Sequence, residues 1–157
     1  PTPAPESNTI YFYLPNEHPY GVFSQWHPTP VTIPTTSLAF LITTSPTASA
    51  ILASHAPTLT FTCAEQAFMF AKALFFADDQ TCTRILSTPD PKTQKKLGKQ
   101  VRGFYEERWT EVKSRVAEVG NWYKFTGDEG LRGVLLGTGE RELVEASARD
   151  RVWGVGF

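Results

Sequence analysis

One stretch decides the fold of this chain: Thr62-Cys63-Ala64-Glu65-Gln66-Ala67-Phe68-Met69-Phe70-Ala71-Lys72-Ala73-Leu74-Phe75-Phe76. It is rich in strong helix formers, and no Gly or Pro interrupts it. The sequence therefore predicts a helix, with the side chain of Thr62 capping its start. At about 100° per residue, the apolar side chains cover almost the whole circumference, which is typical of a buried helix.

Two ionisable residues, Glu65 and Lys72, lie on this apolar helix. Their spacing of seven residues places them within about 20° of each other, on one face. Burying such groups is costly unless they are paired or serve a function. One interpretation is a structural ion pair or two rim residues. The other is a carboxylate and an amine that line a pocket, and the rest of the chain has to separate the two.

Length and composition indicate one globular domain. The chain has 157 residues, of which 41% are hydrophobic and 20% charged, enough for one domain with a real core. The aromatic fraction of 13%, with four Trp, suits a pocket that stacks flat rings. The net charge is −1, and no Lys or Arg precedes Lys72, which argues against a basic N-terminal arm for nucleic acid.

The cysteines and histidines argue against a metal site. Cys63 and Cys82 have no metal-ligand spacing and imply no disulfide framework, so we expect a reducing compartment. The histidines form no HExxH motif or Cys/His cluster, and we expect no structural zinc. The apolar run 38–42 is far too short to span a membrane, and no signal peptide is visible. We therefore expect an intracellular protein, cytoplasmic or nuclear.

The chain reads as short strands followed mostly by helices. Apolar and β-branched runs predict strands at 9–14, 31–33, 38–43, 58–61 and 142–147. Helices are expected at 80–86, 91–97, 104–119 and 129–136, with Gly120-Asn121 ending the longest one before a short turn or helix at 122–125. Residues 1–8 are expected to be a disordered lead-in, and the uncharged segment 45–57 a surface insertion that is partly helical around 48–53. The pattern predicts a compact, mostly helical α+β single domain over 9–157, with a small β-sheet.

A basic series follows the central helix. Its members recur at three- and four-residue spacing, so a continuous helix would place along one side Lys92, Lys95, Lys96, Lys99 and Arg102. Such a series is either a solvated basic face or an edge that attracts phosphate.

Common enzyme motifs are missing from the sequence. It has no GxSxG elbow, no P-loop and no GxGxxG after a strand. The remaining candidates for acid–base or nucleophilic chemistry are Glu65, Lys72 and Asp150, with Trp109 and Trp153 as stacking candidates. Asp150 between two arginines could equally be surface charge, and tryptophans are more often core residues than substrate platforms.

Several blocks follow one another along the chain: Tyr20-Gly21-Val22-Phe23-Ser24-Gln25-Trp26, Glu65-Gln66-Ala67-Phe68 through Lys72-Ala73, Lys96-Leu97-Gly98 with Trp109 and Lys124-Phe125, Leu135-Leu136-Gly137-Thr138-Gly139, Leu143-Val144-Glu145-Ala146-Ser147 and Asp150-Arg151-Val152-Trp153-Gly154-Val155-Gly156. In this order they resemble one known family, the NADAR or YbiA-like family. The resemblance runs from about Phe12 to the last residue, although Gln66 stands where many members have His.

The resemblance implies an N-glycosidase that needs neither metal nor cofactor. Its substrate would be ADP-ribosylated guanine in DNA or RNA, or a ribosylamine phosphate of the riboflavin pathway; both join ribose C1 to an amine nitrogen. A third reading is a non-catalytic ADP-ribose-binding module, against which Glu65 and Lys72 argue. No membrane partner is implied.

Helix geometry and the resemblance together suggest roles for individual residues. Lys72 is the expected Schiff-base nucleophile, because burial lowers the pKa of a lysine and so provides a neutral amine. Glu65 is the expected general acid/base. Asp150 is expected to bind ribose hydroxyls or to assist proton transfer. The expected substrate-binding residues comprise two aromatic walls and three close contacts: Trp109, Trp153, Gly21, Ser24 and Gly154.

Overall fold

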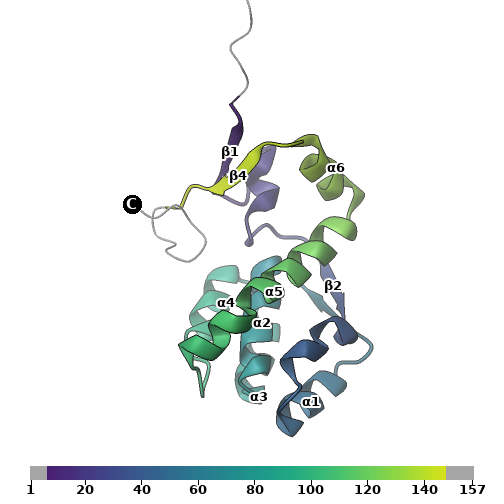
Figure 1. Ribbon diagram of the computed structural model, residues 1–157, viewed down its shortest axis with the longest axis vertical. Coiled ribbons are helices and arrows are strands. Elements are labelled where there is room, and N and C mark those ends of the chain that lie inside the picture. The colour runs from purple at the N-terminus through teal and green to yellow at the C-terminus, as the bar shows by residue number, and fades with distance from the viewer. Residues whose placement is uncertain (1–6, 148–157) are drawn as a thin grey trace, which may run out of the picture. The chain divides into compact units, whose positions relative to one another are not determined.

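The computed structural model describes residues 7–147 and has the expected mostly helical α+β fold, with two two-stranded sheets rather than one (Figure 1). The chain forms two compact units. The first contains the described residues up to His27 and from Asp128 onward, and the second is Pro28–Gly127. We describe each unit by itself.

The first unit joins the two ends of the described chain. Strand β1 (Thr9–Phe12) pairs in parallel with β4 (Glu142–Glu145), so that Ile10 lies opposite Leu143. The short 3-10 helix η1 (Tyr20–Phe23) packs the ring of Phe23 against Phe12, with 5.7 Å between the ring centroids. Helix α6 (Glu129–Gly137) lies where the helix at 129–136 was expected, and the Asp128 side chain caps it by accepting a hydrogen bond from the Leu131 N–H.

The second unit is built around α2 (Ala64–Phe75), the predicted central helix. This helix packs against α1 (Pro46–Ala53), α3 (Asp79–Leu86), α4 (Pro91–Gly98) and α5 (Glu106–Thr126). Strands β2 (Val31–Pro34) and β3 (Thr58–Phe61) form an antiparallel two-stranded sheet, and β3 leads into this helix. Phe70 and Leu74 are fully buried in the core, as expected for a helix that is apolar on nearly all sides.

The cap of α2 differs from the prediction. The N-cap residue is Cys63, whose side chain makes no capping bond, and the Thr62 hydroxyl instead donates to Gln66 Oε1 at 3.2 Å. Gln66 Oε1 also accepts the Thr62 N–H at 2.7 Å. The helix start is therefore tied down from within by a glutamine of its first turn, because that amide reaches back to the preceding residue.

The predicted strand at 38–43 is wrong, because residues 35–41 form the 3-10 helix η2 (Thr35–Leu41). Thr35 anchors its start, with both its N–H and its hydroxyl donating to Pro57 O. Thr35, Leu38 and Leu41 are the buried residues. Their spacing of three matches the period of a 3-10 helix and places them on one side.

The predicted end of the long helix at Gly120 is also wrong, because α5 continues to Thr126. Its buried residues include Val116, Gly120 and Lys124, which recur every four residues and form a core-facing stripe. A glycine inside a helix costs about 1 kcal/mol relative to alanine. The packing of this stripe overrides that local preference.

The segment expected as a surface insertion, 45–57, contains α1. Ser45 caps this helix by accepting the Ala48 N–H at 3.1 Å. Ala48, Ile51 and Leu52 are buried and belong to the core of the second unit.

Candidate active site

Helix α2 places Glu65 and Lys72 on one face, seven residues apart, as expected from its periodicity. Glu65 lies in the first turn of the helix and is only 7% exposed. The partial positive charge at a helix N-terminus favours a carboxylate in that turn. Lys72 lies in the last turn and is half-buried. The two chemically useful groups therefore occupy opposite ends of a helix that the core holds rigidly.

The Lys72 amine lies against an aromatic ring. Its Nζ is 4.3 Å from the ring centroid of Phe104, in a cation–π contact. Burial lowers the pKa of Lys72; the charge of Glu106 opposes this shift and that of Lys99 adds to it. A lowered pKa increases the fraction of neutral amine at neutral pH, which is the form that attacks carbon.

A buried polar cluster surrounds the start of α2. The amide of Gln66 donates to the carbonyl oxygens of Ile85 and Thr88, each at 3.0 Å. Gln94 is fully buried; its amide donates to Thr88 O at 2.8 Å, and its Oε1 accepts from Cys63 Sγ at 3.3 Å. These bonds join α2 to α3 and α4, so Gln66 has a structural role here.

Lys124 is a candidate that sequence reasoning placed only within a family block. Its side chain, on α5, is 1% exposed. Burial lowers the pKa of Lys124 to about 8, against an opposing effect of Cys63. Burial also raises the pKa of the Cys63 thiol, and the charge of Glu65 adds to that rise. The four-residue spacing of Val116, Gly120 and Lys124 is the sequence signal for this buried stripe, and a helix that ends at Gly120 leaves Lys124 outside it.

Trp109 lies in the core of the second unit. It is 5% exposed, and its ring packs edge-on against Phe68, with 5.3 Å between the centroids. The ring of Phe75 is tilted relative to it, at a centroid distance of 6.3 Å. These contacts make Trp109 a packing partner of α2, on the side of that helix that bears Phe68 and Phe75. Its expected role as an aromatic wall for substrate stays a prediction.

Gly21 and Ser24 belong to the first unit, whereas α2 belongs to the second. A Cβ on Gly21 would come within 2.7 Å of Leu14 O, so a close backbone approach requires glycine there. Ser24 is buried, and its Oγ accepts the Trp26 N–H at 3.2 Å. Both residues thus have local structural roles, and their expected contacts with substrate stay predictions.

The remaining predicted site residues, Asp150, Trp153 and Gly154, lie outside the described residues. Within 7–147, His, Cys, Asp and Glu side chains form no group of three that could hold a metal ion. In the same part of the chain, none of the helices combines the length and apolarity that crossing a bilayer requires.

The basic series divides between two settings. Lys92, Lys95 and Lys96 lie on α4, and Lys99 is its C-cap residue. Arg102 lies beyond the helix, where its guanidinium pairs with Asp78 at 2.9 Å. The series is therefore not one continuous helical face, as the sequence interpretation required, although Lys92, Lys96 and Lys99 are exposed.

Comparison with known proteins identifies the family. The NADAR domain matches residues 11–157, so the chain belongs to the NADAR family. Its fold is similar to the NMR structure of the Escherichia coli protein YbiA, with a TM-score of 0.68 and 24% identity over 96% of this chain and 74% of that one.

Two curated relatives resemble part of the chain. Protein irg-1 of Caenorhabditis elegans is 36% identical over 101 residues, which are 63% of this chain and 48% of the relative. An N-glycosidase of Acanthamoeba polyphaga mimivirus is 37% identical over 94 residues, which are 60% of this chain and 55% of the relative. The chain thus spans about half the length of these relatives.

Proposed function

We propose that this NADAR-family chain is an N-glycoside hydrolase that cleaves the bond between ribose C1 and an amine nitrogen. The observation that carries the proposal is the pairing, on one face of α2, of a buried carboxylate with a half-buried amine whose pKa is lowered. The similarity to a mimiviral protein named as an N-glycosidase supports the same reaction class.

Lys72 is proposed to act as a nucleophile through amine exchange. Protonation of the ring oxygen opens the ribosylamine, breaking the bond from C1 to that oxygen and forming a C1=N imine. The neutral Lys72 amine adds to C1, and the substrate nitrogen takes a proton and departs as a free amine. Water then adds to the resulting Schiff base, Lys72 leaves, and the released aldehyde closes to ribose. The net reaction consumes one water.

Glu65 is proposed to move the protons of this sequence. Seven residues of α-helix separate the Cα atoms of Glu65 and Lys72 by about 10 Å along the axis. We propose that the ribose binds between them, within reach of both long side chains. As a general acid, Glu65 protonates the ring oxygen or the departing nitrogen, and as a general base it then activates the hydrolytic water.

ADP-ribosylated guanine in nucleic acid is the substrate that we favour. The segment 91–105 contains four Lys and one Arg and no Asp or Glu. Phe104 and Tyr105, at its end, are exposed aromatics. Cationic side chains beside exposed rings suit a phosphate backbone whose bases stack on aromatic faces, and Phe104 already touches Lys72. We also propose that Asp150 binds ribose hydroxyls or assists proton transfer. The proposed substrate-binding residues are Trp109, Trp153, Gly21, Ser24 and Gly154.

A release assay with two substrates tests the proposal. The protein is incubated separately with DNA carrying ADP-ribosylated guanine and with the ribosylamine phosphate of the riboflavin pathway, and the freed sugar is quantified. We expect ADP-ribose from the first. Release only from the second assigns the flavin precursor as substrate. Binding of ADP-ribosylated DNA with no release from either substrate would instead support a non-catalytic ADP-ribose-binding module.

A further inference from the structure

Two contacts, one from α2 and one from the turn between α2 and α3, reach the segment that connects α4 with α5. Lys72 meets Phe104 through the cation–π contact of 4.3 Å. Six residues after Lys72, Asp78 meets Arg102, which stands two residues before Phe104. The same short segment therefore provides both the ring over the amine and the anchor that fixes the segment.

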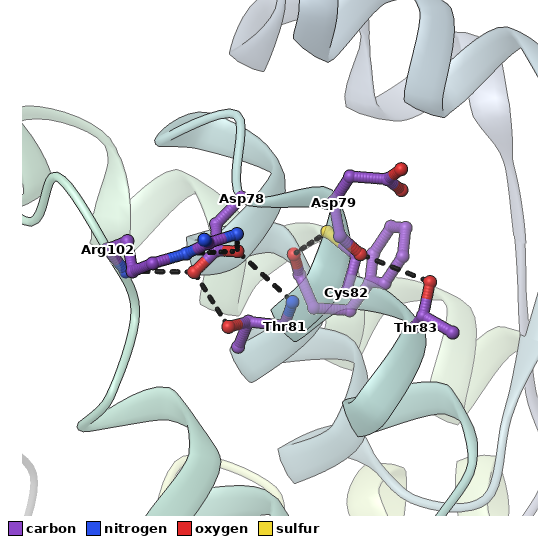
Figure 2. Close-up of polar contacts among 7 residues, drawn as sticks. Asp78, Asp79, Thr81, Cys82, Thr83 and Arg102 are labelled. Atoms are coloured by element: carbon purple, nitrogen blue, oxygen red, sulfur yellow. Dashed lines mark hydrogen bonds and ion pairs between the residues drawn. The ribbon is translucent and has the colours of Figure 1, made fainter.

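The anchor is built on a buried carboxylate (Figure 2). Asp78 Oδ1 accepts from the Arg102 guanidinium at 2.9 Å, and Oδ2 accepts from the Arg102 N–H at 2.8 Å. The Thr81 N–H and hydroxyl donate to the same carboxylate at 3.1 and 2.7 Å. Although burial opposes it, these donors hold the pKa of Asp78 far below its usual range. The carboxylate thus stays charged and keeps Arg102 in place at physiological pH.

The backbone on both sides of the anchor is also set for this arrangement. Ala77 has φ +55° and turns the chain out of α2 directly before Asp78. Gly103, with φ +74°, lies between Arg102 and Phe104, where a left-handed conformation favours glycine. Phe76 supports the Phe104 ring edge-on, with 5.4 Å between centroids. Phe104 is nevertheless 41% exposed, so packing alone does not explain where its ring is held.

We propose that Phe104 is a positioning residue for Lys72: its ring, fixed by the Arg102–Asp78 ion pair, aims the Lys72 side chain and stabilises its protonated form in the resting protein. The part of this inference that concerns catalysis rests on the proposed function. The charged groups that face Lys72 from neighbouring elements are Lys99 at the end of α4, which disfavours the ammonium, and Glu106 on α5, which favours it. The ring adds an uncharged stabiliser to this balance.

Phe104→Leu separates the aromatic effect from simple burial, because leucine keeps an apolar cover but has no π-face. The Lys72 pKa is measured by NMR on protein with ¹³C-labelled lysine, which requires no substrate. We expect the pKa to fall by about 0.5–1 unit in Phe104→Leu, and to stay at least as high as in the wild type in Phe104→Trp. Tyr105→Leu, at the neighbouring exposed aromatic, is the matched control and is expected to leave the Lys72 pKa unchanged.

Arg102→Gln tests the anchor and provides a second route should Phe104→Leu fail to fold. The variant retains the rings of Phe76 and Phe104 and the hydrogen bond from the residue-102 N–H to Asp78, but it removes the ion pair. We expect the Lys72 pKa to fall by less than it does in Phe104→Leu. A Lys72 pKa that is unchanged or raised in folded Phe104→Leu overturns the inference. If that variant does not fold, an unchanged pKa in Arg102→Gln does so.

Activity measurements then distinguish this inference from the proposed function. If Lys72 is the nucleophile, the acid limb of the pH profile of kcat/KM moves to lower pH in Phe104→Leu by the same amount as the Lys72 pKa. A pKa shift in a protein that releases no sugar from either substrate contradicts the proposed function and leaves the positioning contact standing. If the protein releases sugar but the acid limb of its kcat/KM profile does not move in Phe104→Leu, the positioning role in catalysis is contradicted.

Discussion

Two lysines of the second unit differ in how far they are buried: Lys124 on α5 is enclosed, and Lys72 on α2 is half-buried. Lys124 is enclosed in the interior, where burial lowers its pKa to about 8. Lys72 is half-buried at the other end of α2, under the partly exposed ring of Phe104. Burial lowers the pKa of both amines. A lowered pKa therefore does not identify the nucleophile by itself, and access to a substrate makes Lys72 the better candidate.

The largest expected effect comes from removing the accessible amine. Lys72→Ala is expected to lower kcat/KM for sugar release by at least about 10⁴-fold, because no nucleophile remains to form the Schiff base. The melting temperature should stay near that of the wild type, since Lys72 is only half-buried. Lys113→Ala is the control, as Lys113 is another partly buried lysine, 4.0 Å from Glu106. Equal activity in Lys72→Ala and wild type would contradict the proposal that Lys72 is the nucleophile.

Next in size is the loss of the proton-transfer group. Glu65→Gln preserves the shape of the side chain but cannot exchange protons, so kcat is expected to fall by about 10²–10⁴-fold. The pH profile of kcat should lose one limb. A variant that unfolds, and that regains activity in proportion when the fold is restored by lower temperature, would favour the structural interpretation of Glu65.

The enclosed Lys124 amine is expected to affect the free energy of unfolding and not the reaction. The pKa of Lys124 is about 8 in the folded protein and 10.5 when exposed, so the unfolded chain binds more protons between these values. The free energy of unfolding therefore gains a contribution that rises with pH from about 8 to 10.5, on the order of 3 kcal/mol in total. Lys124→Met should remove this contribution. Denaturant titrations of both proteins across that window measure it, and parallel curves would contradict the account.

The smallest expected effect concerns the polar cluster at the start of α2. Gln94→Leu removes the donor to Thr88 O and the acceptor for Cys63. We expect the free energy of unfolding to fall by about 1–3 kcal/mol, because the buried Cys63 thiol loses its acceptor and Thr88 O keeps only the donor from Gln66. Urea denaturation at constant m-value measures the loss. Gln100→Leu, at an exposed position after α4, is the matched control and should change stability little.

Local rules predicted much of this fold from the sequence. The uninterrupted apolar stretch predicted α2. Helices α3, α4 and α6 also lie where they were expected, and the side chains of Asp78, Asp90 and Asp128 cap them, since each accepts a hydrogen bond from the N–H three residues on. The errors arose where tertiary contacts override local preference. Gly120 continues a helix because one side of it is buried, and η2 follows a three-residue period that resembles an apolar strand in sequence.

The candidate site was only partly predictable for a related reason. The seven-residue spacing on a helix placed Glu65 and Lys72 on one face without further information. The contact of Lys72 with Phe104 joins residues 32 positions apart, and the bond of Asp78 to Arg102 joins residues 24 apart. No local pattern encodes such pairs, so the cover over the amine became visible only in the folded structure.

The most direct test of the central claim is to locate the covalent intermediate. The protein is incubated with ADP-ribosylated guanine DNA and borohydride, and the reduced adduct is mapped by peptide mass spectrometry. We predict an adduct on Lys72 that disappears in Lys72→Ala and persists in Lys124→Met. An adduct on Lys124, or continued sugar release with no trapped lysine, would contradict the assignment of Lys72 as the Schiff-base nucleophile.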